Sequence, residues 1–176
     1  PESTPYVKQL AQQASRAFVM EPSLGPHGKL KTQRKGTGHF VIRVLGKAAH
    51  AGLEPEKGAS AILELSLLIP KIFALNNPEK GITVNVGTID GGVRPNVVAP
   101  ESQGVLDVRF LDIKDGEAIK SQLMALEPTI PNTQIIVEGH IEHPPMQKTP
   151  ESEQLWQLAR QAASELGINL EEATAG

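Results

Sequence analysis

The stretch with the clearest potential for chemistry is Gly46-Lys47-Ala48-Ala49-His50-Ala51-Gly52, in which one imidazole is surrounded by small residues. An alternating pattern precedes it and an apolar helical pattern follows it, so His50 is predicted to lie on a strand-to-helix turn. A histidine held there can donate a hydrogen bond to negative charge that develops on a substrate. The spacing alone favours a simpler interpretation, in which His50 is an ordinary surface histidine in a loop.

Three other polar residues are candidates for ligand binding. Glu21 ends the apolar run Ala17-Phe18-Val19-Met20, which fits a strand buried on both faces, and α/β enzymes hold ligands at the ends of such strands. Asn96 lies in a loop between two predicted strands, where its amide could donate to a substrate, although loop asparagines commonly bond their own backbone. Arg109 follows Asp107 by two residues on a polar strand face, and a surface ion pair is the simpler explanation.

Hydrophobic periodicity predicts the elements that position these residues. The predicted strands are Gly38 to Leu45, Ile82 to Ile89, Gly104 to Leu111 and Thr133 to Ile141, and the helices are about Gly58 to Leu75 and Asp115 to Ala125. The order is strand, helix, strand, strand, helix, strand, and every strand has one polar face. This order predicts an α+β fold, a ferredoxin-like βαββαβ sandwich with a four-stranded antiparallel sheet and two helices on one face.

The first of these helices has a wider apolar surface than one sheet face requires. Its predicted buried stripe is Ile62, Leu65, Ile69, Ile72 and Phe73, with Ala61, Leu68 and Leu75 beside it. We therefore expect the chain to form a homodimer through this helix.

The segments on either side of the sandwich have a different pattern. A helix is predicted from Pro5 to Arg16, before the buried strand that ends at Glu21. Another is predicted from Pro150 to about Leu166, with Thr149 as its cap and Gly167 at its end. The predicted organisation is a central domain at residues 34–143 between two segments of a different class, at 1–33 and 144–176.

Composition excludes several functions and partners. The chain has 176 residues, enough for one domain with a sizeable core, and its net charge of -3 gives no indication of a nucleic-acid or anionic-membrane partner. The absence of cysteine removes disulfides and thiolate chemistry, and leaves the choice between a cytoplasmic and a periplasmic location open. No apolar run approaches the roughly 18 residues of a membrane span, and no signal-peptide pattern is visible after Pro1.

The ordered set of motifs resembles the zinc-dependent exopeptidase and deacylase family that includes glutamate carboxypeptidase, aminoacylase, acetylornithine deacetylase and peptidase T. It is most similar to the glutamate carboxypeptidase group. Besides the segment around His50, the similar stretches are Phe18-Val19-Met20-Glu21-Pro22-Ser23, Arg34-Lys35-Gly36, Val86-Gly87-Thr88-Ile89-Asp90-Gly91-Gly92, Pro95-Asn96-Val97-Val98-Ala99-Pro100 and Asp107-Val108-Arg109-Phe110.

The resemblance implies that residues 34–143 are the lid and dimerisation domain of a two-zinc hydrolase, and that both flanks belong to its α/β catalytic domain. It implies that Glu21 is a zinc ligand and that His50 stabilises the oxyanion, across the dimer. Arg109, Asn96 and Lys29 would bind the substrate, a small peptide or N-acyl amino acid cleaved at an amide bond beside a free carboxylate. A planar guanidinium suits that carboxylate.

The resemblance also implies that the remaining zinc ligands and the catalytic glutamate pair lie outside residues 1–176, so that this chain by itself binds no zinc and is inactive. Within the chain, His140-Ile141-Glu142-His143 is not expected to bind metal, because strand geometry turns its two histidines to opposite faces. Two alternatives of another class stay open. One is a non-enzymatic ferredoxin-like module that binds an amino acid between subunits, and the other is a purely structural assembly module.

Overall fold

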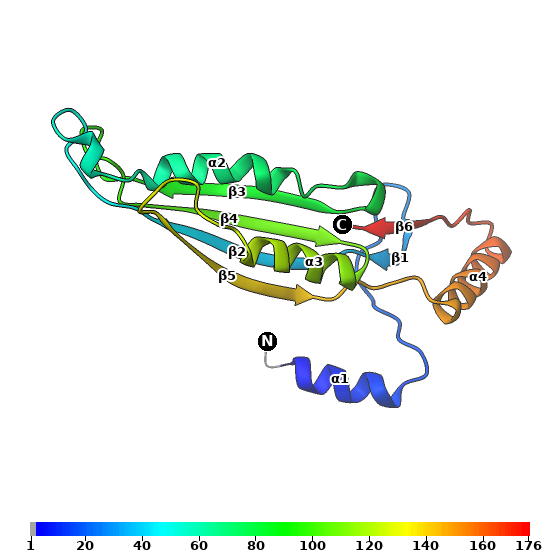
Figure 1. Ribbon diagram of the computed structural model, residues 1–176. Coiled ribbons are helices and arrows are strands. Elements are labelled where there is room, and N and C mark those ends of the chain that lie inside the picture. The colour runs from blue at the N-terminus through cyan, green and yellow to red at the C-terminus, as the bar shows by residue number, and fades with distance from the viewer. Residues whose placement is uncertain (1–2) are drawn as a thin grey trace.

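A computed structural model describes residues 3–176 as a long four-stranded sheet with two helices on one face and a smaller two-stranded unit at one end (Figure 1). The long sheet contains β2 (Gly36–Leu45), β3 (Thr83–Gly91), β4 (Glu101–Phe110) and β5 (Gln134–His143). Its spatial order is β3-β4-β2-β5, and every neighbouring pair is antiparallel. With helices α2 (Ala61–Phe73) and α3 (Ile113–Met124), this confirms the predicted ferredoxin-like sandwich.

The core lies between the sheet and the two helices. Alternation along the strands turns every second residue toward the helices, as the burial of Phe40, Ile42 and Val44 along β2 illustrates. The other core residues include Leu106, Val108 and Phe110 from β4, Leu65, Leu68 and Ile72 from α2, and Ile119 and Leu123 from α3. The opposite face of the sheet carries the polar residues, including Arg109.

The predicted buried stripe of α2 is partly wrong. Ile62 and Phe73 were expected to face the core, but their exposed fractions are 47% and 43%. The buried face instead includes Glu64, which is fully buried because the loop before β5 supplies hydrogen-bond donors to its carboxylate. The exposed residues Ile62, Leu63, Leu67 and Phe73 form what we call the outer face of α2.

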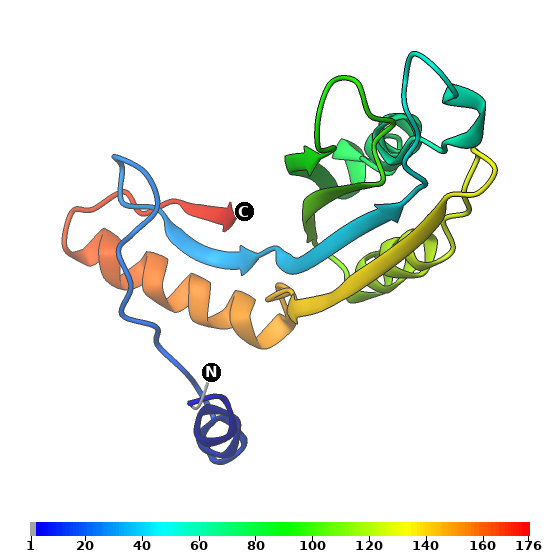
Figure 2. The ribbon, with the colours of Figure 1, turned by 90° about the vertical axis from the view of Figure 1, so that its left-hand side faces the viewer.

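The flanking unit is built from β1 (Leu30–Arg34), α4 (Pro150–Glu165) and β6 (Glu172–Ala175), and helix α1 (Thr4–Gln13) stands apart from it with exposed side chains (Figure 1). Strand β1 runs into β2, and β5 continues through a short connection into α4 (Figure 2). Helix α4 begins and ends as predicted, with Thr149 and Ser152 forming a capping box and Gly167 adopting a φ of 73° after the last turn. None of the helices in the described part of the chain is long and apolar enough to cross a membrane.

The predicted buried strand at Ala17 to Met20 is wrong. These residues are irregular, and Phe18, Val19 and Met20 are exposed. A strand buried on both faces needs neighbours along its edges, and no segment among residues 3–176 pairs with this one. The structure instead has a parallel pair that the sequence analysis did not predict, β1 with β6. The first helix also ends at Gln13, before the predicted Arg16.

A charged network joins β6 to the start of α4. Lys148 Nζ lies 2.6 Å from a carboxylate oxygen of Glu153 and 2.8 Å from one of Glu172, and the Thr32 hydroxyl donates to Glu172 at 2.6 Å. The hydrogen bonds from Lys148 and then Thr32 lower the pKa of Glu172 below its ordinary value of 4.5. The ionised carboxylate therefore stabilises this unit.

Acid is expected to loosen this unit before the long sheet. Since the folded pKa of Glu172 is lowered, its contribution is complete above pH 4.5 and is lost as the pH falls through that lowered value. Hydrogen exchange of β6 should accelerate there while the core strands stay protected. Lys148→Met should weaken this acid dependence, and an identical acid response in that variant would contradict the assignment.

Candidate functional site

The predicted residues His50 and Asn96 meet at one tip of the long sheet. The segment after β2 lies against the segment before β4, with Ala51 N donating to the Asn96 carbonyl at 3.0 Å and Val98 N donating to the Ala49 carbonyl at 3.0 Å. His50 is bridged to Val97 in this pairing. Backbone hydrogen bonds therefore fix the two loops to each other and hold the imidazole beside the Asn96 loop.

Gly46 makes this close approach of the loops possible. Its N–H donates to the Pro100 carbonyl at 2.7 Å. A Cβ atom at this position would collide with the carbonyl oxygen of Ala59 and would lie 3.1 Å from that of Ala99. Glycine is therefore required at position 46, because the backbone at Ala59 and Ala99 leaves no room for a side chain.

The imidazole of His50 is exposed at the tip, and its orientation is set by the next turn. Its Nδ1 atom accepts hydrogen bonds from the backbone N–H groups of Gly52 and Leu53, both at 3.2 Å. Across the described residues 3–176, no hydrogen bond involves Nε2, so this atom is free to meet another molecule. Two backbone N–H groups therefore hold His50 through Nδ1, and Nε2 is left open.

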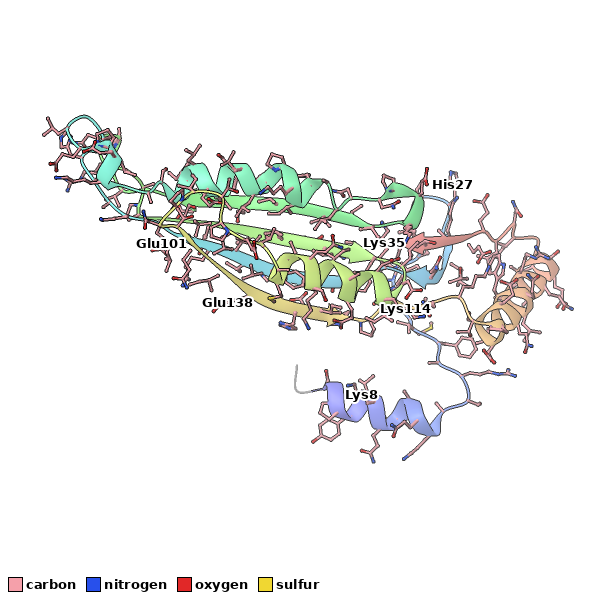
Figure 3. All side chains as sticks on the ribbon, viewed as in Figure 1. Lys8, His27, Lys35, Glu101, Lys114 and Glu138 are labelled. Carbon is pink, nitrogen blue, oxygen red and sulfur yellow. The ribbon has the colours of Figure 1, made fainter. Side chains whose placement is uncertain are left out.

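Arg109 lies near the opposite end of the sheet. It pairs with Thr37 of β2, close to where the flanking unit begins, while Glu101 at the start of β4 pairs with Leu45 near the His50 loop. Figure 3 places Glu101 and Lys35 toward these two ends. The eight steps from Glu101 to Arg109 span about 26 Å along the strand. One chain therefore does not bring Arg109 together with His50.

The guanidinium of Arg109 is already paired. Its Nε lies 2.9 Å and 3.2 Å from the two carboxylate oxygens of Asp107. The hydrogen bond to Asp107 is the main cause that raises the pKa of Arg109. The surface ion pair with Asp107 that the sequence indicated is therefore present. Only Nε takes part in it, so the two terminal nitrogens of the guanidinium can receive a second carboxylate.

Glu21 and Lys29 both lie in the flanking unit. The Glu21 carboxylate pairs with Lys31 at 3.3 Å and with Arg34, and these cations lower the pKa of Glu21, with the Lys31 hydrogen bond as the largest cause. Lys29 Nζ lies 2.7 Å from Glu171. Glu21 is chemically suited to bind a cation, and in this chain two basic side chains neutralise it.

The chain does not gather a zinc site from its own residues. Within residues 3–176, no three His, Cys, Asp or Glu side chains are placed to hold a metal ion. One hollow of about 750 Å³ lies beside α4, and another of about 450 Å³ lies between Lys80 and Lys148. Neither is lined by any of the candidate residues, which are Glu21, Lys29, His50, Asn96 and Arg109.

Sequence reasoning missed two features of the site. The hydrogen bonds to Nδ1 come from backbone groups, and the only sequence signal for them is the short turn after His50. The pairing of Glu21 with Lys31 and Arg34 depends on how the irregular segment folds back on β1, and nothing in the spacing of these residues indicates it.

Comparisons with known proteins agree with this architecture. Residues 32–127 match the family model described as the peptidase dimerisation domain, M20_dimer. Protein YqjE of Bacillus subtilis is 33% identical over 136 residues, which are 76% of this chain and 36% of that protein. Carboxypeptidase G2 of a Pseudomonas species is 26% identical over 117 residues, 66% of this chain and 28% of that protein.

Among solved structures, the aminopeptidase PepT from Bacillus cereus superposes with a TM-score of 0.66 at 25% identity, over 86% of this chain and 42% of that one. The chain thus spans about a third of the length of the two curated relatives. The family match covers more than half of the chain and contains the His50 loop, the Asn96 loop and Arg109. The resemblance read from the motifs is therefore confirmed, and the chain belongs to the M20 peptidase dimerisation domain family.

Proposed function

We propose that this chain is the lid and dimerisation region of a homodimeric two-zinc amidohydrolase of the glutamate carboxypeptidase type. In this proposal residues 34–143 are the lid, and residues 1–33 and 144–176 belong to the catalytic domain. The substrate is a small peptide or N-acyl amino acid, cleaved at the amide bond beside a free carboxylate. The similarity to carboxypeptidase G2 supports this reaction class.

One observation carries the proposal: the His50 tip and the Arg109 end of the sheet lie about 26 Å apart along the strands. Residues so far apart cannot serve one small substrate within a single chain. A two-fold dimer that pairs edge strand β3 with its copy in antiparallel fashion would bring the His50 tip of one lid toward the flanking unit of the other.

The roles follow from the chemistry of each group. The Nε2–H of His50 would donate to the oxyanion of the partner's substrate, and the Asn96 amide would donate to its carbonyl or carboxylate. Arg109 and Lys29 would bind the free carboxylate. Bound zinc would supply an activated water and a polarised carbonyl. Glu21 is the residue of this chain proposed as a zinc ligand.

The experiment is a mixed dimer of full-length subunits that carry different affinity tags. One subunit carries His50→Ala and the other Glu21→Ala, and activity is assayed with N-acyl glutamates, including p-aminobenzoyl-glutamate, which the name of a Haemophilus influenzae relative indicates. Both mutant homodimers should be inactive. The heterodimer should regain activity, because one of its two sites combines an intact Glu21 with an intact His50.

The matched control is a heterodimer of wild-type and Glu21→Ala subunits, which also has one intact site. Equal activity of the two heterodimers is the expected result. A His50→Ala/Glu21→Ala heterodimer as inactive as both homodimers would show that His50 acts within its own subunit, and would overturn the shared site.

The dimer itself is expected to form through the outer face of α2 and the adjacent edge of β3. Leu63 and Leu67 have exposed fractions of 53% and 40%, and Ile89 of β3 is 60% exposed. An exposed apolar patch of this kind marks an interface.

Leu63→Glu with Leu67→Glu should convert the 176-residue chain to a monomer in sedimentation velocity, because two carboxylates would be buried without partners. Met124→Glu places a charge at an exposed apolar position of α3 and is the control, expected to leave the dimer intact. A monomeric wild-type chain at high concentration would refute this interface.

A further inference from the structure

We infer that the turn after His50 fixes its imidazole in a single neutral tautomer, with Nδ1 as an acceptor and the proton on Nε2. The catalytic meaning of this inference rests on the proposed function, because it concerns how His50 donates to the substrate. The tautomer itself is a property of this chain and can be measured without any substrate.

Two backbone donors converge on one ring nitrogen. Gly52 N and Leu53 N each lie 3.2 Å from Nδ1. A neutral imidazole has one protonated nitrogen and one acceptor nitrogen. A proton on Nδ1 would point toward two N–H groups, so the lone pair must be there and the proton must be on Nε2.

The turn is held in place by bonds of its own. Leu53 N and Glu54 N both donate to the His50 carbonyl, at 3.3 Å and 3.1 Å, so residues 51–53 form a closed turn directly after His50. The first residue of this turn is fixed as well, because Ala51 N donates to the Asn96 carbonyl. The donors that face Nδ1 are therefore positioned by the backbone before any substrate arrives, which is the condition for a preorganised site.

The consequence is that, in the neutral ring, the N–H donor is the nitrogen that has no partner within the described chain. His50 is exposed, and over residues 3–176 Nε2 takes part in no hydrogen bond, so the N–H is available to a second molecule. Gly52 and Leu53 thus become positioning residues through their main chain. The small side chains at Ala51 and Gly52 leave the ring uncovered.

Gly52 provides a matched pair of substitutions. A Cβ atom there would lie 3.7 Å from Cε1 and 3.8 Å from Nδ1 of His50, which is ordinary contact, so alanine fits and keeps the N–H. Proline fits a turn but has no N–H to donate. The main difference between the two variants is therefore that Gly52→Ala keeps the N–H that donates to Nδ1 and Gly52→Pro loses it.

The experiment is nitrogen NMR of full-length protein labelled with ¹⁵N-histidine, with the His50 signals identified by their loss in His50→Gln. In the wild type and in Gly52→Ala, Nδ1 should have the shift of an unprotonated nitrogen and Nε2 that of a protonated one. Gly52→Pro keeps the Leu53 donor, so its preference for the Nε2–H tautomer should weaken and a fraction of the Nδ1–H tautomer should appear. A wild-type spectrum with the proton on Nδ1 would overturn the inference.

Activity gives the second measurement. The side-chain amide of glutamine reaches the place of Nε2, whereas that of asparagine reaches the place of Nδ1. His50→Gln should therefore retain a kcat about tenfold above that of His50→Asn, out of the roughly 100- to 1000-fold that one such donor supplies. Gly52→Pro should lower kcat below that of Gly52→Ala, with KM little changed.

The two possible failures are distinguishable. If NMR finds the Nε2–H tautomer but His50→Ala leaves turnover unchanged, the tautomer stands and the proposed function is wrong. If His50→Ala lowers kcat strongly but NMR finds the proton on Nδ1, the reaction class and the need for His50 stand, and the Nε2–H donor inferred here is wrong.

Discussion

Full-length protein that carries His50→Ala is expected to lose about 100- to 1000-fold in kcat, or roughly 2.7–4 kcal/mol of transition-state stabilisation. The oxyanion exists in the transition state and not in the bound substrate, so the lost hydrogen bond should lower kcat while KM changes little. Steady-state kinetics with an N-acyl glutamate substrate measure both constants. The stability of the fold should hardly change, because His50 is exposed at a loop tip.

His140→Ala is the matched control for this experiment. His140 is also exposed and lies on edge strand β5, opposite His39 of β2, and it has no part in the proposed site. Its kcat should stay close to that of the wild type. Unchanged turnover in His50→Ala would instead favour a lid that serves assembly alone, in which the histidine is an ordinary loop residue.

The sandwich was predictable because apolar residues occupy every second position of each strand, which gives the strand one buried and one polar face. The alternation of Phe40, Ile42 and Val44 with His39, Val41 and Arg43 predicts which face of β2 is buried, and the structure buries that face. The helical cap at Thr149 was equally readable, because capping depends on residues within one turn. Local rules were therefore sufficient where the determining contacts are local.

The flanks were harder to predict because their contacts are not local. The apolar run at Ala17 to Met20 has the composition of a buried strand, yet composition does not reveal whether a neighbouring strand is available. The β1–β6 pair joins Leu30 to Glu172, and short polar strands such as these have no strong periodicity of their own. Pairing across such a separation is decided by the tertiary fold.

For the candidate site, the sequence identified residues and the structure supplied their separation. His50 and Asn96, two of the candidate residues, come together because the loops that carry them pair directly. The distance from His50 to Arg109 follows from the register of β2 against β4, in which Gly36 pairs with Phe110 and Leu45 with Glu101. Motif spacing contains no such register, so it could not indicate that the candidates divide between two ends of the sheet.

Glu64 is the residue whose replacement should most reduce the stability of the lid. Its fully buried carboxylate accepts hydrogen bonds from Thr129 N at 3.0 Å, from Ile130 N at 2.6 Å and from the Thr133 hydroxyl at 3.3 Å. These bonds fasten the loop between α3 and β5 to the first turn of α2. A pattern analysis assigns a glutamate to the solvent face of a helix, which is why the predicted stripe of α2 was out of phase.

Glu64→Leu is expected to destabilise the chain by about 2–5 kcal/mol, although leucine suits the surrounding core. The two backbone N–H groups would remain buried without an acceptor, and each unsatisfied donor costs about 1–3 kcal/mol. Urea unfolding, followed by circular dichroism, measures the change in the free energy of unfolding. Glu117→Leu on α3 is the control, because the exposed pair of Glu117 with Lys120 contributes only about 0–1 kcal/mol. If both variants unfold at the wild-type urea concentration, Glu64 does not hold the loop to α2.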